Sequence, residues 1–221
     1  MSEPLMSELG DRLRLPKSAP APYELVILAA SAGGIQAISA ILAALPVNFP
    51  VPIAILQHRS AAVPTILSTI LGRVSPLPVK NAAEGDALTR GTVYVAPPDA
   101  HLVVGVDRRF HLRDGKRINY LRSSADPLVR SAAYALGGRV ITVVLTGAGR
   151  NGASALRDVK ALGGVVIAQD QASSQCWGMP RAAIETGAVD HVLPLHEIAP
   201  MLIRLTRTAD RGAPRPGSAV R

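Results

Sequence analysis

The sequence predicts an α/β fold with a doubly wound, mainly parallel sheet, helices on both faces and a small antiparallel insertion. Apolar residues make up 48% of the 221 residues and aromatic residues only 3%. The core must therefore be built from Val, Ile, Leu and Ala, the usual content of parallel strands covered on both faces. Short apolar runs also alternate with helix-like segments along most of the chain, which is typical of βαβ units.

The elements follow one another in a regular order. The segment 34–45 carries apolar residues at helical spacing, and the segment 63–71 tolerates Pro64 in its first turn. Strands are expected at 24–28, 51–57, 140–145, 165–169 and 189–193, and helices at 34–45, 63–71, 126–136, 152–162, 180–186 and 196–207.

The middle of the chain differs from this alternation. It reads as short strands joined by turns, with Asp107-Arg108 as a tight hairpin connection. We expect these segments to form the antiparallel insertion near one edge of the sheet, at 79–80, 92–96, 101–106 and 109–112.

One domain with two tails is expected. Residues 1–22 read as a flexible leader because Pro16, Pro20 and Pro22 break any helix. Residues 23–207 form the domain, and the Gly-, Pro- and Arg-rich residues 208–221 form a basic disordered tail.

Several function classes are excluded at this level. The single cysteine, Cys176, rules out an intramolecular disulfide framework and a Cys-rich zinc site. No secretory signal is visible and no run approaches the ~18 apolar residues of a membrane span, so we expect no membrane insertion and a cytoplasmic protein. The scarcity of aromatics argues against nucleic-acid stacking platforms. The net charge of +8 fits either a solvated surface with a basic tail or a patch that docks an acidic partner.

Ser31 stands at a strand-to-helix turn, where free helical N–H groups can hold developing negative charge. Gly33 and Gly34 follow it and allow close backbone approach to a substrate. A helix N-cap or a phosphate-cradling turn explains the same residues. No G-x-S-x-G elbow, G-x-G-x-x-G or Walker motif is present, so this segment alone does not decide between the three.

His58 ends the next strand, and Asn151 lies in a third strand-to-helix turn between Gly149 and Gly152. Consecutive parallel strands end at the same sheet edge, so Ser31 and His58 should emerge together, with His58 as a general base. A lone His is also explained as a structural residue, and Asn in a tight turn as a turn former.

Many short motifs occur in order and are spread over nearly the whole expected domain. They read Ser31-Ala32-Gly33-Gly34, Gln57-His58, Glu84-Gly85-Asp86, Tyr94-Val95-Ala96-Pro97 with Asp99 and His101, Ser124 with Asp126, Leu145-Thr146-Gly147, Ala168-Gln169-Asp170 and Gly178-Met179-Pro180. Together these motifs resemble the catalytic domain of CheB-type chemotaxis-receptor methylesterases.

The resemblance implies a serine hydrolase that removes methyl esters from glutamates of methyl-accepting chemotaxis receptors and can deamidate certain glutamines. It implies Ser31 as nucleophile, His58 as base and Asn151 at the position of the triad acid, with the backbone of Ala148 at the oxyanion site. It implies no cofactor or metal. Family members usually carry an N-terminal receiver domain; the short leader leads us to expect none in cis here.

The amide at position 151 leaves two functions open. In well-studied triads, an amide in place of the acid costs ~10⁴ in turnover because the His adopts the wrong tautomer. The chain is then either an impaired esterase or an inactive relative that binds a receptor or similar acidic helical protein through the former substrate groove. A small-molecule phosphate-binding domain is a weaker third alternative.

Two features could supply the acid that position 151 lacks. Asp170 is the candidate for a substitute acid, and Asn151-Gly152 is a dipeptide prone to deamidation, which converts the amide to a carboxylate.

Overall fold

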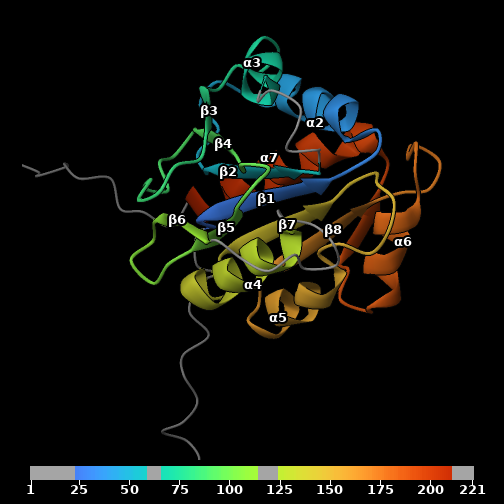
Figure 1. Cartoon of the computed structure of the whole chain (residues 1–221). Coiled ribbons are helices and arrows are strands. Elements are labelled where there is room, and N and C mark those ends of the chain that lie inside the picture. The colour runs from blue at the N-terminus through green and yellow to red at the C-terminus, as the bar shows by residue number, and fades with distance from the viewer. Residues whose placement is uncertain (1–22, 59–65, 114–123, 211–221) are drawn as a thin grey trace, which may run out of the picture.

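A seven-stranded parallel sheet forms the centre of the protein (Figure 1). The computed structural model describes residues 23–58, 66–113 and 124–210. The strand order is β3-β4-β2-β1-β7-β8-β9, and every neighbouring pair is parallel. The predicted fold class is confirmed. The strands are β1 (Leu25–Ala30), β2 (Ile53–Gln57), β3 (Val79–Asn81), β4 (Val93–Val95), β7 (Val140–Val144), β8 (Val165–Gln169) and β9 (His191–Leu193).

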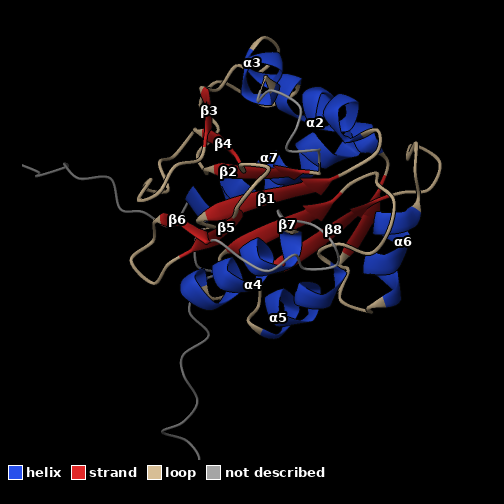
Figure 2. Cartoon of the chain, in the orientation of Figure 1, coloured by secondary structure: helices blue, strands red, loops and turns tan. Residues whose placement is uncertain are grey.

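Helices cover both faces of the sheet (Figure 2). One face packs against α2 (Gly34–Ala43), α3 (Leu67–Gly72) and α7 (Leu195–Asp210). The other face packs against α4 (Ala125–Leu136), α5 (Leu156–Ala161) and α6 (Gly178–Glu185), and a short 3₁₀ turn, Ala153–Ala155, precedes α5.

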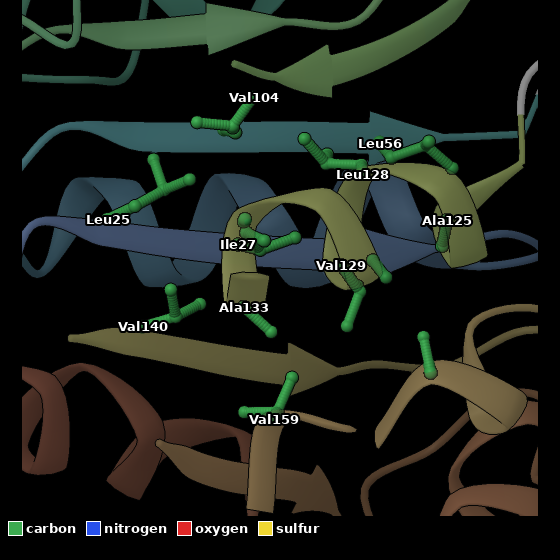
Figure 3. Packing of buried hydrophobic residues seen from close by; sticks show 14 of the residues in the cluster. Leu25, Ile27, Leu56, Val104, Ala125, Leu128, Val129, Ala133, Val140 and Val159 are labelled. Atoms are coloured by element: carbon green, nitrogen blue, oxygen red, sulfur yellow. The ribbon is translucent and has the colours of Figure 1, made fainter. Parts of the chain in front are cut away.

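The alternation of side chains along β1 divides the core into two clusters. Every residue of β1 is buried. Leu25, Ile27 and Ala29 face the cluster that contains α4, and the residues between them face the cluster that contains α2 and α7. Figure 3 shows α4 lying across β1, with Val129 and Leu128 near Ile27. The central strand is thus fixed by packing on both sides.

The extent of the predicted antiparallel insertion was wrong. Only β5 (His101–Val104) and β6 (Phe110–Arg113) pair antiparallel, in a separate two-stranded sheet. The other two segments, β3 and β4, join the parallel sheet, where β4 pairs with β2. All three residues of β4 are buried. A three-residue apolar segment carries too little periodicity to distinguish these two environments from sequence.

Element ends shift by a few residues from the predicted bounds. Helix α7 continues to Asp210, past the predicted end at 207. The predicted helix at 63–71 is described only from Leu67 onward. The expected leader, 1–22, and the expected tail from 211 lie outside the described residues. Across the described ranges, no helix is long and apolar enough to cross a membrane.

Truncating Leu128 tests the packing of α4. This side chain is 0% exposed, so Leu128→Ala should lower the free energy of unfolding by about 2–5 kcal/mol, through lost apolar burial and a cavity. Denaturant unfolding measures this change. Val106 is 91% exposed, and Val106→Ala should stay within about 0.5 kcal/mol of wild type. Equal losses for the two variants would contradict this account of the core.

Candidate active site

Ser31 and His58 follow the carboxyl ends of neighbouring strands. The register of β1 and β2 pairs Ala30 with Gln57, the residues just before them. The backbone N–H of His58 donates to the Ala30 carbonyl at 3.1 Å, and Gln57 Nε2 donates to the Ser31 carbonyl at 2.7 Å. Within the described residues, no hydrogen bond joins the Ser31 hydroxyl to the His58 ring. Such contacts are often long without substrate.

The loop after β7 lies beside Ser31. The Ser31 N–H donates to the Thr146 carbonyl at 3.0 Å, and Thr146 Oγ1 donates to the Ala32 carbonyl at 2.9 Å. Gly149 and Gly152 have φ of 83° and 86°, a left-handed conformation that residues with a Cβ rarely adopt. These two glycines let the loop turn tightly and carry Asn151 back toward His58.

Gly147 permits the closest approach in the site. A Cβ at this position would lie 2.8 Å from Ser31 Cβ, 3.0 Å from Ser31 N and 2.4 Å from Met179 Sδ. The Met179 N–H donates to the Gly147 carbonyl at 2.8 Å, so the first turn of α6 packs against Gly147. The space around Ser31 therefore depends on the absence of a side chain at position 147.

Asn151 is 5% exposed, and its orientation is fixed by backbone. The Ala125 N–H donates to Asn151 Oδ1 at 2.9 Å, and Ser124 Oγ donates to the same oxygen at 2.9 Å. A backbone N–H can only donate, so its partner must be the amide oxygen. The Nδ2 group of Asn151 is consequently directed at His58, whose Nε2 it contacts.

This contact determines the tautomer of His58. An amide nitrogen carries only donors, so His58 Nε2 must accept and the proton of the neutral ring lies on Nδ1. In a working triad the acid accepts from the ring, and the opposite nitrogen is free to take the nucleophile's proton. Here the ring nitrogen opposite Asn151, Nδ1, already holds a proton.

Burial lowers the pKa of His58 to about 4, and the negative charge of Asp126 opposes that shift only in part. The ring is therefore neutral at neutral pH. A neutral imidazole is the correct state for a base, but its low pKa makes it a weak one.

Two residues to which sequence reasoning gave no role support the site. Ser124 is the N-cap of α4, and its hydroxyl both accepts from the Asp126 N–H and donates to Asn151. The Asp126 carboxylate accepts from Gly152 N at 3.1 Å and Ala155 N at 3.2 Å, which holds the turn after Asn151. The available signal was the Ser124-x-Asp126 spacing before a predicted helix.

Asp170, the candidate for a substitute acid, makes its hydrogen bonds within the turn that follows it. Its Oδ1 accepts from Ser173 N at 2.9 Å and Ser173 Oγ at 2.6 Å, which closes the turn after β8. Asp126, and not Asp170, is the carboxylate whose charge acts on His58. Over the described ranges, no group of three or more His, Cys, Asp and Glu residues is placed to hold a metal ion.

Comparison with known proteins agrees with this geometry. The model of the CheB methylesterase family matches residues 26–202. The chain belongs to the CheB methylesterase family. A protein-glutamate methylesterase/protein-glutamine glutaminase of Anaeromyxobacter dehalogenans is 45% identical over 187 residues, which cover 85% of this chain and 54% of the relative.

Two other matches cover almost the whole of the matched chain. A putative protein-glutamate methylesterase/protein-glutamine glutaminase of Leptospira interrogans is 40% identical over 183 residues, 83% of this chain and 95% of the relative. The crystal structure of the Thermotoga maritima CheB methylesterase catalytic domain is similar, with a TM-score of 0.80 and 36% identity over 83% of this chain and 98% of that one. The chain spans about half the length of several curated CheB relatives that it matches.

Gly147→Ala tests the close approach to Ser31. The new Cβ would displace Ser31 or Met179, and a displacement near 1 Å in such a site costs about 10² in rate. Ester hydrolysis by the purified variant measures this. At Gly72 the nearest atom to an added Cβ is 3.9 Å away, so Gly72→Ala should retain the wild-type rate. An active Gly147→Ala protein would contradict this role.

The ring resonances of His58 should titrate with a midpoint at about 4 in the folded protein. NMR observation of the histidine rings against pH measures this value. Asn151→Asp places a carboxylate against the ring, favours the charged form and should raise the pKa. An unchanged midpoint in that variant would mean that the side chain at 151 does not reach His58.

Proposed function

We propose that this chain is a serine-type protein-glutamate methylesterase whose turnover is reduced by the amide at position 151. The proposal includes deamidation of glutamine side chains, the second activity in the names of its relatives. What supports it is that Ser31 and His58 follow the paired ends of β1 and β2, and that Asn151, whose polarity Ala125 fixes, contacts the His58 ring.

In the proposed reaction Ser31 Oγ attacks the ester carbonyl of a glutamate side chain. His58 takes the hydroxyl proton and gives it to the departing methoxide, so that methanol leaves and an acyl-enzyme remains. Water, activated by the same ring, then releases the glutamate. The Ala148 N–H has no hydrogen-bond partner within the described residues, and it lies in the loop beside Ser31. We assign it to the oxyanion that forms in each step.

The reduced rate follows from the direction of one hydrogen bond. Asn151 donates to His58 where an acid would accept, so the ring must change tautomer before it can take the Ser31 proton. The amide also provides no negative charge for the imidazolium that forms. Asp126 supplies part of that charge from the adjacent turn.

The proposed substrate is a methyl-accepting chemotaxis receptor or a similar acidic helical protein, which suits a chain of net charge +8. The proposed location is the cytoplasm. No nucleic acid, membrane insertion, metal or cofactor forms part of the proposal.

The same hydrogen bond favours a second candidate function. A site that holds His58 in the wrong tautomer also suits an inactive relative that binds receptor helices through the former substrate groove. Methanol release from methylated receptor decides between the two. The wild type should release methanol above the level of Ser31→Ala; equal release from the two proteins, with receptor binding retained, would establish the binding function.

Asn151→Asp should raise the rate of ester hydrolysis. The carboxylate accepts from His58, restores the productive tautomer and stabilises the imidazolium, so the gain should approach ~10²–10⁴-fold. Steady-state kinetics on one methylated receptor preparation measure this gain. Asn81 is exposed and lies on the edge strand β3, which β4 separates from β2, so Asn81→Asp adds the same charge as a control. A rate unchanged by Asn151→Asp would refute the account of impairment.

A further inference from the structure

Asn151 and Gly152 form the single Asn-Gly dipeptide of the chain, and the proposed reaction makes no use of its chemistry. Glycine leaves the backbone nitrogen sterically free to attack the preceding side-chain amide. We propose that Asn151 is a self-modification site, at which the folded protein converts this amide to a carboxylate and releases ammonia. Its effect on activity rests on the proposed function, whereas the modification itself does not.

The attacking nitrogen already contacts a base. The Gly152 N–H donates to Asp126 Oδ2 at 3.1 Å, and Asp126 is 5% exposed. A peptide nitrogen becomes a nucleophile only when it loses this proton. Asp126 and Ser154 also line a cavity of about 500 Å³. A carboxylate in place along the N–H bond serves as the general base.

The oxygen of the attacked amide already contacts two donors. As nitrogen adds to Cγ, negative charge develops on Asn151 Oδ1. The Ala125 N–H and the Ser124 hydroxyl each lie 2.9 Å from that oxygen. Two fixed donors at a developing oxyanion are the feature by which hydrolases stabilise a tetrahedral intermediate.

The steps balance with water as the only co-reactant. Asp126 removes the Gly152 proton, the new Cγ–N bond forms, and the bond from Cγ to Nδ2 breaks. The departing nitrogen takes up that proton through solvent and leaves as ammonia, which gives a five-membered succinimide. Water then adds at Cγ, the Gly152 N–H is restored, and a side-chain carboxylate replaces the amide.

The surroundings favour the product. The new carboxylate lies at the N-terminus of the twelve-residue helix α4, where negative charge is stabilised. It keeps both donors to its first oxygen, and its second oxygen faces His58, which can donate from Nε2. All three interactions are stronger with a carboxylate than with an amide.

Peptide mapping of protein aged in heavy-oxygen water tests the proposal. The peptide that contains Asn151 should gain the mass of an amide-to-carboxylate exchange and one solvent oxygen, and the product should be aspartate. The exposed residues Asn48 and Asn81 should remain amides in the same digest. Conversion should be faster in the folded protein than in a denaturant-unfolded sample, where water also opens the ring toward isoaspartate.

Two variants test the assigned roles. Asp126→Asn removes the base and should slow conversion about 10²-fold. Ser124→Ala removes one oxyanion donor and should slow it by about tenfold or more. Circular dichroism establishes whether each variant is folded. If a variant is unfolded, the conversion rates of folded and unfolded wild type test the proposal instead.

An Asn151 peptide that stays unchanged in aged, folded protein would overturn the proposal. So would conversion as fast in the unfolded chain, or isoaspartate as the main folded-state product. An Asn151 peptide that stays an amide in aged protein with steady esterase activity would refute the modification and leave the proposed function intact. Conversion without any esterase activity would refute the proposed function and leave the modification standing.

Discussion

The backbone N–H of Ala125 can only donate, and the atom that accepts from it is Oδ1 of Asn151. The polarity of the site depends on this one bond. It directs the NH₂ group of Asn151 at His58, which in turn places the ring proton on Nδ1. A side-chain donor in place of Ala125 could rotate and let the amide reverse. A backbone donor held by the first turn of α4 cannot.

The sheet delivers the other groups to this point. Strands β2, β1 and β7 are neighbours and parallel, so the turns after them open at the same edge. The Ser31 N–H is bound to the Thr146 carbonyl, and the His58 N–H to the Ala30 carbonyl. Backbone hydrogen bonds therefore hold each turn against its neighbour, independently of the side chains of Ser31 and His58. Replacement of a site residue can change the chemistry without loosening the scaffold.

The fold and the positions of Ser31 and His58 could be predicted from sequence, because apolar runs mark buried strands and parallel strands end together. The sheet membership of β4 could not, since three apolar residues fit either a hairpin or a parallel strand. The support from Ser124 and Asp126 also escaped prediction. Their bonds to the 151–155 turn join segments 26 to 29 residues apart, and local patterns do not report such contacts. Asp170 was chosen on its position at a strand end, but its bonds go to the following turn.

An amide and a carboxylate have nearly the same shape, so the pocket at position 151 accepts either group without repacking. Asn and Asp codons differ by one nucleotide. Under the proposed function, a lineage that carries this scaffold can therefore pass between a slower and a faster form by a single change that keeps the shape of the side chain. Within that proposal, binding to a partner and turnover of that partner become separable traits.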